Sequence, residues 1–298
     1  MILMYHNVVP ADAPSGYRFQ CITLSELVFA RQIWLLRKTF RLLSLADYLR
    51  LSVSQRKSGK YASITFDDTT EITIECVWKL MKKGEFPVTF FVTSEQVDGG
   101  PLFWVAYLNA ICHEQVFDEL EHDGERYLLS GSDSRIKARD DLMSRALASK
   151  DPISYCAGLR DNYRVPERIM KYYRGISSEQ LAAAGRCCWT EIAGHTVRHP
   201  VLPLLGAQEQ RREIVENKEF LENKTGRSVR YLAYPFGDYD LRTIRVAQDA
   251  GFEAAFAVDP KELQVNRFFE YPRVGAYTSR NLCTKILLYK FGLYARNK

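Results

Sequence analysis

The chain has 298 residues, and its apolar content of 46% is enough to form one large hydrophobic core. Its 41 basic and 36 acidic residues leave a formal charge of +5, a mild excess that does not indicate a nucleic-acid-binding protein. The seven cysteines form no CxxC pair, so they fit a reduced compartment better than a disulfide framework.

The apolar runs and the N-terminal sequence bear on localisation. No run of roughly eighteen apolar residues occurs, so the sequence predicts no membrane-spanning helix. The opening Met1–His6 is not followed by the long apolar centre and small-residue cleavage site of a secretory signal, and it has no basic flank. We therefore expect a cytoplasmic protein.

The first third of the chain alternates short apolar runs with amphipathic segments. Strands are predicted over residues 2–5, 40–45, 62–66 and 87–92. Helices are predicted over residues 23–36, from Ser44 onward, and over residues 71–83 with Gly84 as the stop. Thr23–Glu26 has the spacing of a capping box and predicts the start of the first helix.

Residues 98–186 interrupt this alternation with a segment rich in charge and tyrosine. Helical patches are expected within it at 103–111 and 140–148. Because such a length between two core strands is unusual, we expect an insertion or lid within a single domain that spans residues 1–298.

Regular alternation returns after the insertion. Strands are predicted over residues 187–193, 229–234, 253–258 and 272–276, and helices over 207–224, which Gly226 closes, and 241–250. Repeated strand and helix units predict an α/β protein with either a parallel barrel or a doubly wound sheet. In both architectures, functional sites lie at the carboxyl ends of the strands.

Several segments place polar groups directly after a predicted strand. They are His6, Asp67–Asp68, His195, His199 and the turn Tyr234–Asp238. Because the carboxyl ends of parallel strands meet at one rim, we expect these groups to lie close together.

Two histidines and one carboxylate can bind a divalent metal ion and leave positions open for water. Each signal is weak by itself, since histidines four apart occur on protein surfaces and an acidic pair such as Asp67–Asp68 commonly caps a helix. The spacing of the two histidines fits one face of a helical turn. Because Pro200 disfavours helix at His199, a tight loop is equally plausible. Their joint occurrence at strand ends favours a metal site with a second carboxylate left to transfer a proton.

Water at such a metal ion has a pKa of about 7 in favourable sites and can attack a carbonyl carbon. Hydrolysis of an amide also needs an acid for the departing nitrogen, and histidine suits this role near neutral pH. His113 and His122 lie in charged segments typical of a solvated face. His6 is the remaining candidate, with a packed or capping histidine as the alternative.

These residues resemble the polysaccharide deacetylases with a NodB homology domain, which form carbohydrate esterase family 4. Thr65–Asp68 matches the first motif of the family, His195–His199 the second, and Tyr234–Gly237 a variant of the third. The resemblance spans nearly the whole chain outside residues 98–186. It implies a distorted (β/α) barrel of about seven parallel strands with the inserted segment as a lid.

The resemblance also implies roles for individual residues. Asp67 would be the general base, and Asp68, His195 and His199 would bind the metal, usually zinc in this family. The backbone N–H of Phe236 would help to hold the oxyanion.

The chain departs from the family pattern in two places. No arginine opens the third motif, and Arg273 is a candidate to replace it, with a surface cation as the alternative. The family usually has its acid histidine near the C-terminus, but no histidine follows His199. The opening Leu3–His6 resembles a circularly permuted branch in which this histidine comes first, which implies His6 as the acid.

We therefore expect a metal-dependent hydrolase that removes N-acetyl groups from an amino-sugar-containing glycan or glycolipid. A deacetylase or amidase acting on a non-carbohydrate small molecule and a sugar-binding protein without activity remain alternatives. Iron oxygenases also use two histidines and one carboxylate, but the spare carboxylate and the missing short H-x-D spacing argue against them.

Two further segments allow two interpretations each. The tail Lys285–Lys298 mixes apolar and basic residues, which fits either contact with the inner face of the membrane or a helix packed on the barrel. We favour the packed helix. Trp104 and the tyrosines of the insertion fit either stacking on sugar rings or local core, and local core is the commoner outcome.

Overall fold

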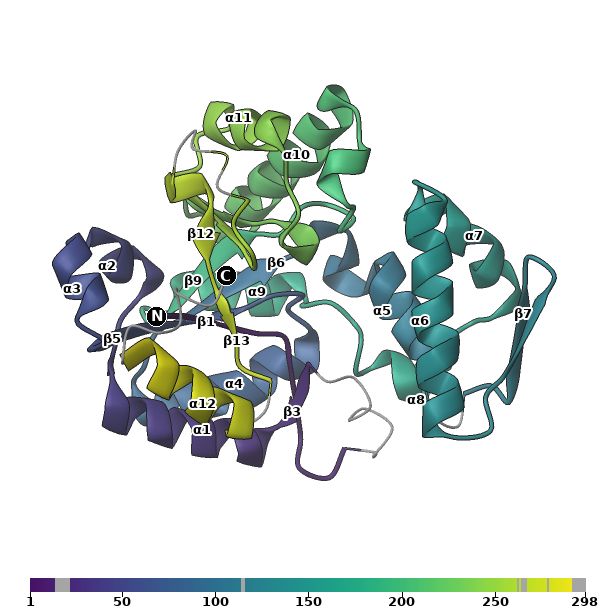
Figure 1. Cartoon of the computed structure of the whole chain (residues 1–298), viewed down its shortest axis with the longest axis horizontal. Coiled ribbons are helices and arrows are strands. Elements are labelled where there is room, and N and C mark those ends of the chain that lie inside the picture. The colour runs from purple at the N-terminus through teal and green to yellow at the C-terminus, as the bar shows by residue number, and fades with distance from the viewer. Residues whose placement is uncertain (14–21, 114–115, 262, 264–266, 278, 291–298) are drawn as a thin grey trace.

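The computed structural model describes residues 1–13, 22–113, 116–261, 263, 267–277 and 279–290 (Figure 1). Its main sheet has nine strands, of which eight follow one another in the order β12–β11–β10–β9–β6–β5–β1–β13, while β4 pairs with β5 beside this path. All neighbours in this sheet are parallel. The predicted distorted (β/α) barrel is confirmed, with eight strands in the nearly closed wall.

The barrel strands are short and apolar. They are β1 (Ile2–Tyr5), β4 (Arg41–Leu42), β5 (Tyr61–Phe66), β6 (Val88–Val92), β9 (Thr190–Gly194), β10 (Tyr231–Ala233), β11 (Ala254–Ala257), β12 (Tyr271–Pro272) and β13 (Val274–Gly275). Every residue of β1, β6, β10 and β11 is buried, as expected for parallel strands that are covered on both faces. Their continuous apolar runs are what made the strands predictable.

The segment 271–275 closes the barrel. Its first half, β12, pairs with β11, and its second half, β13, pairs with β1. Arg273 lies between the two halves, and its backbone N–H donates to the carbonyl of Ala257. One short stretch of chain therefore contacts both edges of the sheet.

Helices surround the barrel. They are α1 (Glu26–Thr39), α2 (Leu45–Arg50), α3 (Val53–Lys57), α4 (Glu71–Gly84), α9 (Ser178–Arg186), α10 (Ala207–Thr225), α11 (Leu241–Asp249) and α12 (Ser279–Lys290). Short 3-10 turns lie at η2 (Ser94–Gly99), η3 (Leu202–Leu204), η4 (Pro235–Gly237) and η5 (Arg267–Phe269). Apolar side chains of the helices and strands share one core, which includes Phe29, Phe66, Phe90, Ile214 and Ile244.

Helix boundaries differ from the sequence predictions at the start of α1 and the end of α4, and the helix predicted over residues 140–148 begins earlier, at Ser132. Ser25 caps α1, because Thr23–Ser25 forms β3 and pairs with β2 (Asn7–Val9), so the predicted cap at Thr23 is wrong. Helix α4 includes Gly84 and ends at Glu85, which adopts a left-handed conformation with φ 48°. Gly226 closes α10 in the left-handed conformation, as predicted.

The inserted segment forms a unit beside the barrel, on the right in Figure 1. It consists of α5 (Trp104–Ile111), the hairpin β7 (Glu119–His122) and β8 (Glu125–Leu128), α6 (Ser132–Ala148), α7 (Pro152–Asn162) and α8 (Glu167–Met170). Its apolar residues, from Leu102 to Tyr173, form a core of their own with Val9 and Ala13. Leu181 and Ala184 of α9 pack in the barrel core instead. The predicted insertion of residues 98–186 and the single-domain assignment both stay predictions.

Helix α12 packs against the barrel through Leu282 and Ile286, which are buried in the main core. This agrees with the packed-helix interpretation for residues up to Lys290. The remainder of the predicted tail, residues 291–298, lies outside the described residues. Among the helices of the described ranges, none has the length and apolar content needed to cross a membrane.

Candidate active site

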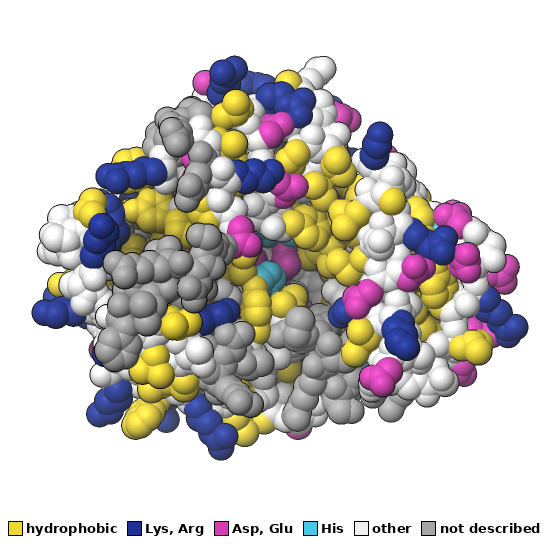
Figure 2. Space-filling model, in the orientation of Figure 1, with side chains coloured by type: hydrophobic (Ala, Val, Ile, Leu, Met, Phe, Trp, Pro, Cys, Tyr) yellow, Lys and Arg dark blue, Asp and Glu magenta, His cyan; other side chains and the backbone are white. Residues whose placement is uncertain are grey.

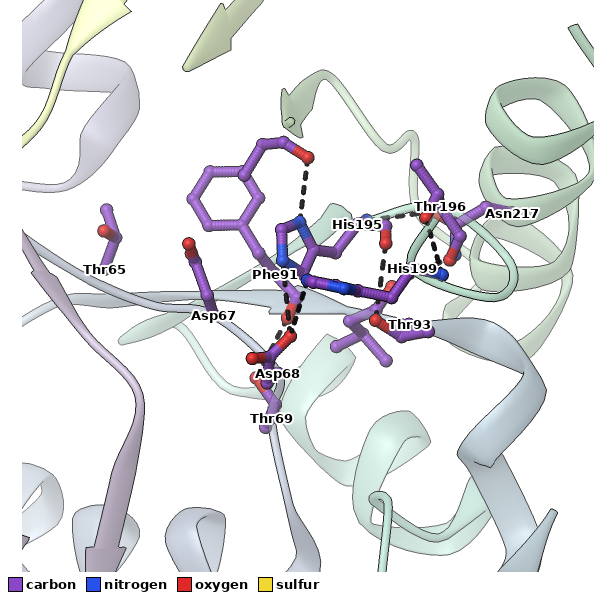
Figure 3. Close-up of polar contacts among 12 residues, drawn as sticks. Thr65, Asp67, Asp68, Thr69, Phe91, Thr93, His195, Thr196, His199 and Asn217 are labelled. Carbon is purple, nitrogen blue, oxygen red and sulfur yellow. Dashed lines mark hydrogen bonds and ion pairs between the residues drawn. The ribbon is translucent and has the colours of Figure 1, made fainter. Parts of the chain in front are cut away.

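The residues predicted to form a site come together at the carboxyl ends of the barrel strands, and Figure 3 shows Asp67, Asp68, His195 and His199 among them. His6 follows β1, Asp67 and Asp68 follow β5, His195 and His199 lie in the loop after β9, and Arg273 separates β12 from β13. The N–H of Asp67 donates to the carbonyl of Tyr5 at 2.9 Å, which places His6 beside the two aspartates. Figure 2 shows cyan histidine atoms in the central hollow of the surface, so the site is open to solvent.

Asp68, His195 and His199 form a cluster of potential metal ligands. Nε2 of His195 lies 3.3 Å and Nε2 of His199 lies 3.4 Å from Oδ1 of Asp68. One ligand atom from each of the three residues lies within 4.8 Å of the others. Oδ1 of Asp68 is buried and has no hydrogen-bond partner among the described residues.

The protonation states fit a cation at this point. Nδ1 of His195 lies 2.8 Å from the carbonyl of Ala233, which can only accept, so Nδ1 carries a proton and Nε2 of the neutral ring is an acceptor. Burial lowers the pKa of His199 to about 4, so this ring is neutral near pH 7. Burial would raise the pKa of Asp68, but His199 and His195 outweigh it and hold the pKa far below its ordinary value.

The pKa of His195 is raised, whereas that of His199 is lowered. Burial would lower the pKa of His195, but Asp68, which can accept a hydrogen bond from the protonated ring, and the charge of Asp67 raise it above its ordinary value. A metal ion would compete with this proton, since a ligand imidazole must be neutral. Two imidazole nitrogens and one carboxylate oxygen fit a divalent ion such as zinc.

The backbone around the site is strained. Asp68, Thr196, His199 and Phe236 are in the left-handed region, with φ of 53°, 65°, 57° and 60°. Such conformations cost on the order of 1–3 kcal/mol each in residues other than glycine, and persist only where the surroundings fix them. The cost indicates that the fold holds these residues in place for their side chains or backbone groups.

Asp67 has a different partner from its neighbour Asp68. Nη1 and Nη2 of Arg273 donate to its two carboxylate oxygens at 2.5 and 2.6 Å. The guanidinium is completely buried and lies over the ring of Phe91, 5.0 Å from its centroid, so Arg273 is not a surface cation. Burial would raise the pKa of Asp67, but Arg273 and His195 outweigh it and lower the pKa, so the carboxylate stays ionised.

His6 lies on the same rim. Its Nδ1 is buried without a hydrogen-bond partner among the described residues, and its ring lies 5.7 Å from that of Tyr277. Burial lowers the pKa of His6, and the charges of Asp67 and Asp68 oppose this shift. The site thus contains a free imidazole beside the two carboxylates.

Phe236 borders the histidines through its side chain. Its ring lies 4.9 Å from that of His199 and 5.5 Å from that of Trp104, and it is partly exposed. The oxyanion role of its backbone N–H stays a prediction.

Helix α10 contributes two positioning residues that the sequence analysis missed. Asn217 accepts from the N–H of His195 at 3.1 Å and donates to the carbonyls of Val92 and Thr196 at 3.0 and 2.7 Å. The Glu213 carboxylate accepts from the N–H groups of residues 197 and 198 at 3.0 and 2.9 Å. Both residues lie on the buried stripe of α10 with Ile214, a helical spacing that the sequence does contain.

The inserted unit also contacts the histidine loop. The ring of Phe103 stacks on His199 at 4.5 Å, and Nε1 of Trp104 donates to the carbonyl of His199 at 3.1 Å. Trp104 is buried, so it belongs to the core and not to a sugar-stacking surface. His113 is buried as well, so the predicted solvated face is wrong for this residue.

Comparison with protein families supports the resemblance to the polysaccharide deacetylases. A family model described as polysaccharide deacetylase matches residues 178–255, a stretch that carries His195, His199 and Tyr234–Gly237. The resemblance to the polysaccharide deacetylases is confirmed. The circularly permuted arrangement stays a prediction.

One relative of this polysaccharide-deacetylase-like chain is YxkH of Bacillus subtilis (strain 168), which is named provisionally as a polysaccharide deacetylase. It is 28% identical over 124 residues, and the alignment covers 36% of this chain and 44% of YxkH. The match therefore spans less than half the length of this relative.

Solved structures share the fold over nearly the whole chain. The deacetylase PplD of Streptococcus pyogenes, in complex with acetate, has a TM-score of 0.62 at 15% identity and is covered to 96%, as is this chain. IcaB from Ammonifex degensii has a TM-score of 0.58 at 17% identity, with 97% of this chain and 96% of IcaB covered. At these identities the similarity shows the fold alone.

Proposed function

We propose that this protein is a metal-dependent hydrolase that removes N-acetyl groups from an amino sugar in a glycan or a glycolipid. The observation that carries the proposal is the division of labour between adjacent carboxylates: Asp68 faces two imidazoles, whereas Asp67 is held by Arg273. One carboxylate is thus available as a metal ligand and the other as a base. The resemblance to polysaccharide deacetylases supports the class of substrate.

Asp68, His195 and His199 would hold the metal ion, which supplies a Lewis acid that lowers the pKa of water and polarises a carbonyl group. Asp67 accepts a proton from the water that attacks the acetyl carbon. His6 donates a proton to the departing nitrogen as the C–N bond breaks. The products are acetate and a free amine.

Two further groups would assist these steps. Arg273 is a positioning residue, since its two hydrogen bonds fix the Asp67 carboxylate and keep it ionised. The N–H of Phe236 would stabilise the developing negative charge on the carbonyl oxygen. A lowered pKa makes protonated His6 a stronger acid, although it also reduces the protonated fraction near neutral pH.

The central test is acetate release by the purified protein with zinc, screened over amino-sugar nucleotides, lipid-linked sugars and N-acetylated oligosaccharides. We expect Asp67→Asn and His6→Ala to lower turnover by roughly 10² to 10⁴ without loss of bound metal. Near-normal turnover of the His6→Ala protein would refute the acid assignment.

Metal content separates the ligands from the base. Asp68→Ala and His195→Ala should lower the zinc content measured by plasma emission, whereas Asp67→Asn serves as the matched control that keeps its zinc. Equal zinc content in all four proteins, wild type included, would reject this ligand set.

The alternatives give distinct results in the same assay. An iron oxygenase would need oxygen, whereas a hydrolase still releases acetate under anaerobic conditions. A sugar-binding protein without activity would bind an oligosaccharide in calorimetry and release no acetate from it. A substrate outside the carbohydrates would appear as acetate release from small N-acetylated molecules only. A cytoplasmic location stays a prediction from the sequence.

A further inference from the structure

The exposed side of α1 carries only large apolar and basic side chains. Leu27, Arg31, Trp34 and Lys38 form one stripe at helical spacing, while Phe29 on the opposite side is buried in the barrel core. Trp34 is 64% exposed and Leu27 is 57% exposed. The outer stripe of this helix is therefore not used in packing.

Neighbouring helices extend this surface. Leu287 of α12 is 57% exposed, and α12 lies beside α1 in Figure 1. A groove of about 660 Å³ runs between α1 and α4, lined by the apolar residues Ile33, Trp34, Leu80 and Phe86 and the basic residues Arg37, Lys38 and Lys83. We call the surface of α1, α4 and α12 around this groove the α1 face. Figure 2 shows yellow side chains flanked by dark blue ones at the lower left, where Figure 1 places α1.

The charge of the α1 face is strongly one-sided. Within the described side chains of α1, α4 and α12, the exposed basic residues are Arg31, Arg37, Lys38, Lys79, Lys82, Lys83 and Lys290. The exposed acidic residues are Glu75 in α4 and Glu85, which directly follows α4. A second copy of the α1 face would bring basic side chains against basic side chains, so the complementary partner is an anionic surface.

We propose that the α1 face binds the surface of an anionic lipid bilayer. Tryptophan and leucine on a helix with flanking lysine and arginine are the composition of segments that lie in the interfacial region of a membrane. The apolar side chains would enter the headgroup boundary, while the basic residues keep their charged ends at the lipid phosphates. The histidine atoms in the central hollow of Figure 2 lie away from this edge, so a bilayer at α1 leaves the candidate site open.

This inference does not depend on the proposed deacetylase activity. It also differs from the predicted contact through the tail, because Leu27 and Trp34 lie in α1, far from the tail in sequence, and only Leu287 and Lys290 of the α1 face belong to the tail. Anionic lipid attracts each basic residue near the surface with an effect of about fivefold on partitioning. Replacing two of these basic residues by acidic ones should therefore strongly lower binding to anionic vesicles.

The test is flotation of the full chain with vesicles of phosphatidylcholine alone and of phosphatidylcholine with phosphatidylglycerol, at low and high salt. We expect binding to the anionic vesicles only, and weaker binding at high salt. Trp34→Ser and the pair Arg31→Glu with Lys38→Glu should each lower binding at least about tenfold. All three side chains are exposed, so an unchanged circular dichroism melting curve checks that the variants fold.

Matched controls lie on other surfaces of the protein. Leu128→Ser removes an equally exposed leucine from β8, and Arg211→Glu with Arg212→Glu reverses two exposed charges on α10. Both control proteins should bind as the wild type does.

Several results would overturn the proposal. They are the absence of flotation, equal binding to neutral vesicles, or an equal loss in the control proteins. The same holds if heparin, a soluble polyanion, binds the α1 face as tightly as the vesicles do. A dimer in sedimentation velocity that Trp34→Ser abolishes would instead identify a second copy as the partner.

Discussion

Two carboxylate–arginine pairs lie at opposite ends of the barrel strands. Asp67 and Arg273 meet at the carboxyl ends, are buried, and share two hydrogen bonds. Glu191, the second residue of β9, and Arg230, directly before β10, share one hydrogen bond of 2.5 Å at the amino ends. Both of these side chains line a cavity of about 370 Å³ and are 19% and 31% exposed, so water reaches the pair.

The pKa of the carboxyl group moves in opposite directions in the two pairs. Burial raises the pKa of Glu191, Arg230 only partly offsets this, and the charges of Glu253 and Asp47 add to the rise. At Asp67 the burial effect is outweighed by Arg273 and His195. A carboxylate paired with an arginine therefore stays ionised at the carboxyl ends of the strands, whereas the carboxyl group at the amino ends is protonated more readily. The difference comes from the number of hydrogen bonds and the sign of the neighbouring charges.

The largest expected effect is at the buried pair. Arg273→Leu leaves the Asp67 carboxylate buried without its partner, and should lower the free energy of unfolding by about 3–5 kcal/mol in urea denaturation. Arg273→Lys keeps the charge but cannot form both parallel hydrogen bonds to the carboxylate, so it should lower the free energy of unfolding by less than Arg273→Leu does. A loss below about 1 kcal/mol for Arg273→Leu would contradict a dominant role for this pair.

Neutral contacts at the same end should have an intermediate effect. Asn217→Leu removes one of the two acceptors of the His195 N–H, the other being the carbonyl of Val92, together with the amide donor to the carbonyl of Thr196. It should lower the free energy of unfolding by about 1–3 kcal/mol. It should also weaken zinc binding by roughly 10- to 100-fold in a competition titration with a chelator. Asn217→Asp keeps an acceptor for the His195 N–H but loses the donor to the carbonyls of Val92 and Thr196, so it separates the two contributions of the amide. Unchanged zinc affinity in the leucine variant would show that Asn217 serves the fold alone.

The pair at the amino ends should contribute less. Arg230→Leu breaks a partly exposed ion pair and should lower the free energy of unfolding by about 1 kcal/mol or less. Zinc content and acetate release should stay at the wild-type level, because this pair lies at the far end of the strands. Equal losses for Arg230→Leu and Arg273→Leu would remove the contrast between the two ends.

The smallest effect is a pH dependence at Glu191. Because its pKa is raised in the folded state, the native protein binds this proton more tightly than the unfolded chain does. The resulting stabilisation is full below the ordinary glutamate pKa of 4.5 and is lost as the pH rises through the folded pKa. The Glu191→Gln protein should therefore gain stability relative to the wild type as the pH rises from acidic to neutral. Denaturation curves across this range would show the opposite slope if the pKa were lowered.

The strands and the potential metal ligands were predictable because local sequence determines them. Buried parallel strands are continuous apolar runs, and Asp67, Asp68, His195 and His199 follow such runs directly. The partners of these residues were harder to predict. Asn217 and Glu213 lie in a helix whose charged residues mask its buried stripe.

Other misses reflect tertiary packing. Both Thr23 and Ser25 can cap a helix, and the pairing of β3 with β2 decides between them. His113 lies in a charged segment but is buried by the core of the inserted unit, which the sequence could not show. The packing of α9 on the barrel could not be predicted either, because its sequence is that of any amphipathic helix.

Residues 271–275, which pair with both edges of the sheet, affect the order in which the barrel forms. The Asp67–Arg273 contact joins residues 206 positions apart, and it forms at the point where β12 and β13 connect the two sheet edges. Contacts of such high sequence separation are slow to form, because the intervening chain must first be ordered. We therefore expect the Asp67 carboxylate to be aligned only after the last barrel strand has docked, later than the approach of Asp68 to His195, which does not involve that strand.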